Sequence, residues 1–224
     1  DSIDSHTIRL IGKKPLRLEK VCLDPRIMTG FLEDTGGVVS MSGTISPLDM
    51  FRDLVGLKSN TILEKVESIF PLENKKVLYL DDVTTSYAEL NSKPSLWNRI
   101  VSKLELITNN FNGNIALFFP SYKLLELALE SLKLKKPVYR EYSGMDQEEL
   151  MQTVESFKSD SGAVLAGVMG GRLAEGIDYP DTSLEMAVIV GIPYPSPGVR
   201  QNALQHYYDI SFIMPHQLNF FKNK

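Results

Sequence analysis

The sequence predicts an α/β fold, a three-layer sandwich around a mostly parallel β-sheet. Short apolar runs such as "NIALFFP" and "AVLAGVM" are typical of strands that are buried on both faces. Segments with apolar residues at helical spacing separate these runs, which is the alternation that a parallel sheet requires. Apolar residues make up 43% of the 224 positions, so the chain can bury a substantial core.

The expected elements alternate along the chain. Apolar runs predict strands over residues 16–23, 38–44, 76–82, 114–120, 136–141, 163–169 and 185–192. Helical spacing and helix-start signals predict helices over residues 26–34, 47–57, 94–111, 121–132, 145–157 and 198–209. We expect residues 1–15 to be a connecting segment and residues 58–75 to be irregular. The order of elements is that of a RecA-like sandwich formed by one lobe over residues 1–224.

Composition limits the classes of function. The formal net charge is −4, so the chain is not a basic nucleic-acid-binding protein, and any such contact must be local. The single cysteine, Cys22, excludes an internal disulfide and a cysteine-ligated metal site, and it predicts a reducing, cytoplasmic compartment. No apolar run reaches membrane-spanning length, and residues 1–10 lack a signal-peptide pattern. We expect the chain to begin inside a longer protein.

In "MSGTISP" a predicted strand ends in small residues, with the hydroxyls of Ser42 and Thr44 on either side of Gly43. Small hydroxyl residues at a strand end allow a carboxylate or phosphate to approach closely. The same segment also fits a simple helix-entry turn, with Ser46 as N-cap and Pro47 at the first helical position. Both interpretations stay open from the sequence.

In "FFPSYKLLE" a predicted strand is followed by Ser121 and Tyr122 at the start of a helix. Amides at a helix N-terminus suit a phosphate, and a tyrosine ring can stack on a base. The alternative is structural, with Ser121 capping the helix and Tyr122 covering the edge of the sheet.

The segment "GGRLAEGIDYP" follows a predicted buried strand and combines small, flexible residues with charges. Its notable members are Gly170, Gly171, Arg172, Glu175, Gly176 and Asp178. The glycines permit close backbone approach, and Arg172 can bind a phosphate or a carboxylate with its two-pronged guanidinium. Glu175 and Asp178 can accept hydrogen bonds from ribose hydroxyls, orient a water or hold an arginine of a partner lobe. The alternative is a surface turn held by a salt bridge from Arg172.

The next strand leads into "GIPYPSPGVRQ", where three prolines stiffen the loop. A rigid loop with Tyr194 and Arg200 can present a platform to a polymer, or it can simply connect a strand to a helix. The histidines His6, His206 and His216 have no metal-ligand spacing, so we expect surface or capping roles for them and no metal site.

Taken together and in this order, these segments resemble the second motor domain of superfamily 2 DNA helicases of the XPD/DinG class, and archaeal XPD-like members in particular. "MSGTISPLDMF" resembles the family's "SGTLSP" segment, and "ALFFPSYKLLE" resembles its motif IV. "GVMGGRLAEGIDYP" resembles motif V with its "EGID" signature, and "AVIVGIPYPSPG" resembles the strand and loop that follow. The resemblance covers most of residues 16–209.

Several family features are missing from the sequence. There is no "GxxxxGK[ST]" phosphate loop, no "DEAH" box and no set of four cysteines, all of which belong to the family's first motor domain. Motif VI, of the form "QxxGRxxR", should follow the last helix, but no arginine follows Arg200, so we expect residues 210–224 to be incomplete relative to the family.

The resemblance implies an ATP-dependent 5′-to-3′ DNA helicase, acting in DNA repair in an archaeal or bacterial cell. ATP and magnesium, and an iron–sulfur cluster outside this chain, are its implied cofactors. Single-stranded DNA and the first motor domain of the same protein are its implied partners, without a membrane. The implied nucleotide-binding and coupling residues are Gly171, Arg172, Glu175, Gly176 and Asp178. The implied DNA contacts are Ser121, Tyr122, Tyr194 and Arg200, and the implied inter-lobe contacts are Ser42, Gly43 and Thr44.

Two other classes of function fit the sequence. One is a non-catalytic RecA-like module that docks or regulates partners, which a full-length gene without an upstream phosphate loop would favour. The other is an α/β enzyme complete in itself, but the sequence offers no nucleophile–base pair to support it. In the helicase interpretation, this chain alone is inactive.

Overall fold

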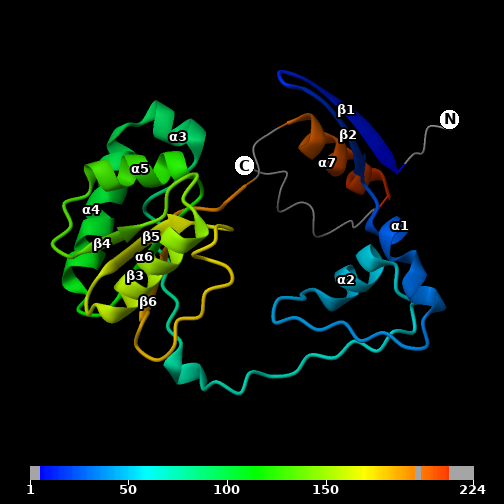
Figure 1. The fold of residues 1–224 in the computed structure, drawn as a ribbon, viewed down its shortest axis with the longest axis horizontal. Helices are drawn as coiled ribbons and strands as arrows, with labels where there is room; N and C mark the ends of the chain where they lie inside the picture. The colour runs from blue at the N-terminus through cyan, green and yellow to red at the C-terminus, as the bar shows by residue number, and fades with distance from the viewer. Residues whose placement is uncertain (1–5, 195–197, 212–224) are drawn as a thin grey trace. The chain divides into compact units, whose positions relative to one another are not determined.

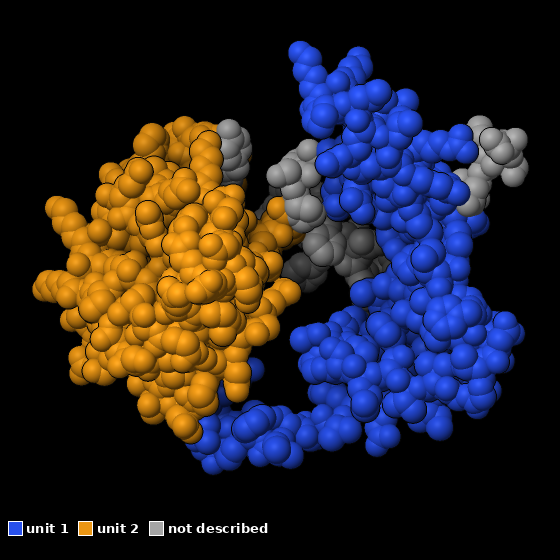
Figure 2. Space-filling view, in the orientation of Figure 1, with its two compact units in different colours: residues 1–76, 195–224 blue, residues 77–194 orange. Residues whose placement is uncertain are grey.

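The computed structural model describes residues 6–194 and 198–211, which fall into two compact units (Figures 1 and 2). The first unit comprises residues 1–76 and 195–224, and the second comprises residues 77–194. The assignment of residues 1–224 to one motor lobe stays a prediction.

The second unit is built on a four-stranded parallel sheet (Figure 1). Its strands are β3 (Ile115–Phe119), β4 (Val138–Arg140), β5 (Val164–Val168) and β6 (Met186–Ile189), in the spatial order β4-β5-β3-β6. A helix, α5 or α6, lies in the connection from β3 to β4 and in that from β4 to β5, whereas β5 is joined to β6 by a segment without a helix. The predicted α/β fold with a mostly parallel sheet is therefore confirmed.

Helices cover both faces of this sheet (Figure 1). The helices α4 (Ser95–Asn110) and α5 (Tyr122–Ser131) pack on one face, and α6 (Gln147–Ser159) packs on the other. The short helix α3 (Tyr87–Ser92) precedes α4. The three layers are those of the predicted sandwich.

The core of the second unit follows from the alternation of side chains along β3. All five residues of this strand are buried. One set of its residues faces α4 and α5, and this cluster includes Ile115, Leu117, Phe119, Ile100, Leu104, Leu125 and Ala128. The other set faces α6, and this cluster includes Ala116, Phe118, Leu150, Val154 and Phe157. Such continuous burial explains why the strand reads as an unbroken apolar run.

The first unit contains an antiparallel hairpin and several short helices. Its elements are β1 (Thr7–Lys13), β2 (Leu16–Cys22), α1 (Pro25–Thr29), a 3₁₀ helix (Gly30–Asp34), α2 (Leu48–Val55), a second 3₁₀ helix (Leu72–Asn74) and α7 (Val199–Ser211). A small apolar cluster joins the hairpin to α7 through Val21, Leu23 and Tyr207. Strand β1 lies within residues 1–15, where the sequence predicted a connecting segment.

Two predicted strands are wrong. Residues 38–44 and 76–82 are not strands, and their side chains are largely exposed, with Val39 83% and Tyr79 88% exposed. A strand needs a neighbour for its backbone hydrogen bonds, and neither segment pairs with another strand in the part of the chain that the structure describes. Apolar β-forming residues alone did not determine the local structure.

The predicted cap of α2 is also wrong. The helix begins at Leu48, directly after Pro47, and no side-chain hydrogen bond caps it, so Ser46 is not its N-cap. It ends at Val55, and the next residue, Gly56, has φ of 75°, the left-handed conformation that favours glycine after a helix. Over residues 6–194 and 198–211, no helix combines the length and the hydropathy needed to cross a bilayer.

Candidate functional site

The carboxyl ends of the four parallel strands place several predicted site residues at one edge of the sheet. The backbone ladder continues just past the strands, where the Met169 N–H donates to the Phe119 oxygen at 2.8 Å. On the other side of β5, the Glu141 N–H donates to the Ala166 oxygen at 2.9 Å. The segments that start at this edge are residues 120–122, 141–146, 169–179 and 190–194. Open α/β sheets bind their ligands at this edge.

Apolar side chains anchor the glycine-rich loop, residues 169–179. Leu173 is fully buried in the cluster that α6 forms with the sheet. Ile177 and Tyr179 pack against the same cluster, and the Tyr179 hydroxyl donates to the Leu173 oxygen at 3.0 Å. Burial, with a smaller contribution from the negative charge of Glu141, raises the pKa of Tyr179 to about 12. These contacts fix the path of the loop.

The tip of the loop presents two carboxylates to solvent. Glu175 and Asp178 are exposed, and neither carboxylate forms a hydrogen bond or an ion pair with any residue that the structure describes. Gly176 lies between them with φ of 81°, a conformation that other residues rarely adopt. The N–H groups of Ala174 and Glu175 both donate to the Gly171 oxygen at 3.1 Å, which closes the turn. Both carboxylates can therefore accept hydrogen bonds from a ligand or a partner domain.

Arg172 points away from these carboxylates. Its guanidinium donates to the Met145 oxygen at 2.5 Å and to Gln147 Oε1 at 3.4 Å, at the start of α6. The salt bridge from Arg172 to Glu175 or Asp178, which was the structural alternative for this loop, is not formed. The loop is held by its apolar residues instead.

The segment after β3 has the predicted helix cap. The Ser121 hydroxyl accepts a hydrogen bond from the Leu124 N–H at 3.3 Å, so Ser121 caps α5. The Tyr122 hydroxyl donates to Glu141 Oε1 at 2.7 Å. Burial and the hydrogen bond to Glu141 raise the pKa of Tyr122 to about 12. A DNA contact by Tyr122 stays a prediction, and in this structure it would have to use the ring.

Glu141 is the residue of this edge that the sequence did not single out. It directly follows β4, it is 1% exposed, and its second oxygen, Oε2, has no hydrogen-bond partner among the described residues. The only sequence signal was a charged residue at the end of a short predicted strand, in "KPVYRE". That signal is equally typical of an exposed residue.

Of the other predicted residues, Tyr194 ends the segment over residues 190–194, and the rest belong to the first unit. Tyr194 is 64% exposed and belongs to the second unit, whereas Arg200 is an exposed residue of α7 in the first unit, and residues 195–197 lie outside the described residues. Ser42 and Thr44 form an exposed turn of the first unit, with their hydroxyl oxygens 3.2 Å apart, beside a cavity of about 580 Å³. Gly43 lies exposed between them. Their inter-lobe role stays a prediction.

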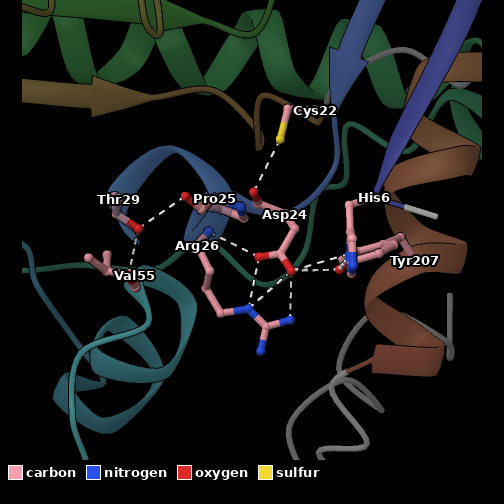
Figure 3. Close-up of polar contacts among 8 residues, drawn as sticks. All are labelled: His6, Cys22, Asp24, Pro25, Arg26, Thr29, Val55 and Tyr207. Carbon is pink, nitrogen blue, oxygen red and sulfur yellow. Dashed lines mark hydrogen bonds and ion pairs between the residues drawn. The ribbon is translucent and has the colours of Figure 1, made fainter. Parts of the chain in front are cut away.

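A second polar cluster joins the hairpin, α1 and α7 (Figure 3). Asp24 is 3% exposed, and its Oδ2 accepts from Arg26 Nη2 and from the Tyr207 hydroxyl, each at 2.7 Å. These contacts, that with Arg26 first, hold the pKa of Asp24 well below its ordinary range. His6 Nδ1 lies 2.7 Å from the Tyr207 hydroxyl, so His6 belongs to this network. The network connects elements of the first unit.

Acidic, histidine and cysteine side chains do not gather into a metal site in the part of the chain that the structure describes. Over residues 6–194 and 198–211, no three of these groups lie close enough together to hold an ion. His216 lies outside the described residues.

Comparison with known proteins agrees with this geometry. The helicase C-terminal domain family matches residues 104–217, and the helical and beta-bridge domain family matches residues 5–89. The chain is 31% identical over 167 residues to the ATP-dependent DNA helicase XPD of Sulfolobus acidocaldarius, covering 71% of this chain and 29% of that protein. It is 28% identical over 214 residues to the Fanconi anemia group J protein homolog of Gallus gallus, covering 84% of this chain and 17% of that protein.

Solved structures show the same fold. An apo XPD structure matches with a TM-score of 0.66 and 26% identity, covering 95% of this chain and 44% of that one. A second XPD helicase structure has a TM-score of 0.62 at 21% identity, covering 95% of this chain and 38% of that one.

The parallel sheet, its two helical layers and the loops at its carboxyl edge define a RecA-like motor domain. The chain belongs to the XPD class of superfamily 2 helicases and contains their C-terminal motor domain. It spans less than a third of the length of the curated relatives described above. Relatives occur in an archaeon, the chicken and yeast, so the resemblance does not restrict the chain to archaeal or bacterial cells.

Proposed function

We propose that this chain is the second motor domain of an ATP-dependent helicase that translocates 5′-to-3′ on single-stranded DNA in DNA repair. The loop over residues 169–179 carries the proposal, because its apolar side chains fix it while the carboxylates of Glu175 and Asp178 face solvent without a partner among the described residues. Fixed acceptors at the carboxyl edge of a parallel sheet suit a ligand that approaches from outside. The relatives named as ATP-dependent DNA helicases support ATP and DNA as the ligands.

In this proposal ATP lies between the present lobe and the first motor domain. Glu175 and Asp178 accept hydrogen bonds from ribose hydroxyls or from an arginine of that domain. Gly171 and Gly176 allow the backbone to approach the nucleotide. Arg172 now donates to Met145, so it reaches a phosphate only after leaving that contact.

DNA contacts are proposed for two other segments. The exposed Ser121 hydroxyl and the Tyr122 ring lie at the start of α5. Tyr194 lies within the proline-rich segment and Arg200 in α7, which follows it. Aromatic rings and cationic side chains bind single strands without reading their sequence. The turn of Ser42, Gly43 and Thr44 is proposed to contact the partner lobe. Closure around ATP and reopening after hydrolysis then move the two lobes along the strand.

The implied cofactors fit this chain to different degrees. The acceptors Glu175 and Asp178 suit ATP, and hydrolysis of ATP supplies the free energy for movement. We propose that the first motor domain holds Mg²⁺, because the resemblance assigns the family's "DEAH" box to that domain. The iron–sulfur cluster does not fit this chain, because Cys22 is its single cysteine. The Cys22 thiol donates a hydrogen bond to the backbone oxygen of Asp24 at 3.1 Å.

The test is unwinding by the full protein that contains this chain. A duplex with a 5′ single-stranded tail should be unwound in the presence of ATP and Mg²⁺, and a duplex with a 3′ tail should not. Equal unwinding of both would contradict the polarity. A folded full protein that binds partners but neither hydrolyses ATP nor unwinds DNA would instead support a non-catalytic RecA-like module.

A further inference from the structure

Glu141 is a buried acidic residue to which the proposed mechanism gives no role. Its Oε1 accepts the hydrogen bond from Tyr122, and its Oε2 is buried without a partner among the described residues. Moving a carboxylate out of water is costly unless hydrogen bonds or opposite charges compensate. One tyrosine hydroxyl compensates only in part, so the position of this side chain needs an explanation beyond stability.

The glycine-rich loop supplies the second contact. A Cβ placed on Gly171 would lie 3.0 Å from Glu141 Oε2, and a Cβ placed on Gly167 would lie 3.2 Å from the same atom. The carboxylate therefore lies directly against the backbone of the end of β5 and of the loop. Neither glycine can carry a side chain unless its neighbours move.

One side chain thus touches two segments that are separate in sequence. Through Oε1 it holds Tyr122, the first residue of α5, and through Oε2 it contacts the loop that carries Glu175 and Asp178. A displacement of Tyr122 therefore moves a carboxylate that lies against the backbone of Gly171. Close-packed contacts of this kind transmit small shifts because the interior offers no free volume.

We propose that Glu141 is a positioning residue that couples the start of α5 to the glycine-rich loop. The link itself stands on the geometry of Tyr122, Glu141 and Gly171. The functional consequence, that DNA contact at α5 is transmitted to the residues facing the nucleotide, rests on the proposed function.

Amide hydrogen exchange in the full protein tests the link without requiring any activity. Tyr122→Phe removes the hydrogen bond to Glu141 at nearly constant volume, so exchange should speed up in residues 169–176, which are remote in sequence. We expect about a 2- to 10-fold change, the range that corresponds to one net hydrogen bond. Unchanged exchange in this loop overturns the link.

Tyr139→Phe is the matched control. The Tyr139 hydroxyl donates to Asp160 Oδ2 at 2.6 Å, and Asp160 precedes β5 at the opposite edge of the same sheet. This variant loses the same type of tyrosine–carboxylate hydrogen bond. Exchange in residues 169–176 should not respond to it, and an equal response to both variants would indicate a general loosening of the unit.

The coupling role is tested by the factor by which single-stranded DNA stimulates ATP hydrolysis. Tyr122→Phe and Glu141→Ala should lower this factor similarly, and the double variant should lower it no further, because both remove one link. Glu141→Gln should retain most of the stimulation, since its amide oxygen still accepts from Tyr122. Should Glu141→Ala not fold, Tyr122→Phe and Glu141→Gln alone decide.

The outcomes separate the link from the function. Equal losses of basal and stimulated hydrolysis, or losses that multiply in the double variant, contradict the coupling role. A wild-type protein without DNA-stimulated ATPase activity would refute the proposed function, and amide exchange would still decide the link between Tyr122, Glu141 and the loop.

Discussion

Gly170 and Gly171 are neighbours that require glycine for different reasons. Gly170 has φ of 71°, and a Cβ there would meet nothing within 4 Å. At Gly171 a Cβ would lie 2.7 Å from Val168 Cγ2 and 2.9 Å from the Val168 oxygen. The first position needs a left-handed backbone, and the second needs the absence of a side chain.

The order in which Ala and Asn destabilise the protein should be opposite at these two positions. Gly170→Ala should cost roughly 1–2 kcal/mol from the left-handed backbone, and Gly170→Asn should cost less because asparagine tolerates that conformation. Gly171→Ala should cost about 1–3 kcal/mol from crowding, and Gly171→Asn should cost more because it is larger. Chemical denaturation of the four variants measures this, and the same order at both positions would contradict the assignment.

Asp178 provides the residue-scale test of the nucleotide site. In the full protein Asp178→Ala should leave stability within about 0.5 kcal/mol, because the side chain is exposed and unpaired within the described residues. The variant removes the acceptor, so unwinding and DNA-stimulated ATP hydrolysis should fall sharply, while DNA binding without nucleotide is largely kept. The control is Asp181→Asn, which removes the charge of another exposed acid of the same connection at φ of 52°, a conformation that asparagine tolerates. Normal unwinding by Asp178→Ala would exclude its coupling role.

At the scale of elements, the Asp24 network joins segments that are distant in sequence. Tyr207 on α7 donates to Asp24, which follows β2, over a separation of 183 residues. Arg26 supplies a two-pronged contact to the same carboxylate from α1. The hairpin, α1 and α7 therefore share one buried acceptor, beside the apolar contacts of Val21, Leu23 and Tyr207.

Stability of the first unit should depend on pH through Asp24. Folding lowers the pKa of Asp24, so its contribution is fully present above the ordinary value of 3.8 and is lost as the pH falls below it. Asp24→Asn should therefore destabilise the unit at pH 7, by roughly 1–3 kcal/mol, and the difference from wild type should shrink below pH 3.8. Denaturant unfolding at both pH values checks this.

The control for this prediction is Glu19→Gln. Glu19 accepts from Arg17 at 3.3 Å on the same hairpin, and the Arg17 side chain is 68% exposed. An exposed pair of this kind is worth about 0–1 kcal/mol. A loss as large as that of Asp24→Asn would show that any charge on the hairpin matters equally.

Local patterns predicted the four strands of the parallel sheet and the helices α4, α5 and α6, because each of them packs against the sheet, but they missed the short helix α3. The runs around β3 and β5 are buried on both faces, and helical spacing places Ile100 and Leu104 of α4 on the core. The segments 38–44 and 76–82 also contain strand-forming residues but lack a pairing neighbour among the described residues. Strand formation depends on pairing, which sequence periodicity does not reveal.

The candidate site was predicted unevenly for a related reason. Glu175 and Asp178 stand out because glycines and charges together follow a buried strand. Glu141 has no such context, and only the tertiary structure shows that it is buried beneath Gly171 beside Tyr122. Arg172 was predicted from its chemistry, but its direction toward Met145 depends on where α6 begins.

At the scale of the whole molecule, the missing phosphate loop limits what the chain does alone. The sequence has no phosphate-loop lysine and no acidic magnesium-binding box, so this chain by itself should neither hydrolyse ATP nor unwind DNA. Phosphate release by the purified chain, with and without single-stranded DNA, measures this. Robust ATP hydrolysis that co-purifies with the chain would contradict the assignment to a single motor lobe.

The net charge of the whole chain leads to a prediction about its affinity for single-stranded DNA. With a net charge of −4 the chain should bind weakly on its own, through a few local cations such as Arg200. Each phosphate neutralised contributes about −0.7 to the slope of log affinity against log salt concentration, because its counterion is released. Arg200→Ala should therefore make the slope shallower by about 0.7.

The control is Lys65→Ala, which removes one positive charge from the segment over residues 58–75, where Lys65 contacts Glu67 at 3.9 Å. This variant should leave the slope unchanged. Fluorescence anisotropy across a salt series gives both slopes. If the two variants change the slope equally, binding depends on net charge and Arg200 is not a specific contact. Tight binding that persists at high salt would require a basic groove to which neither residue belongs.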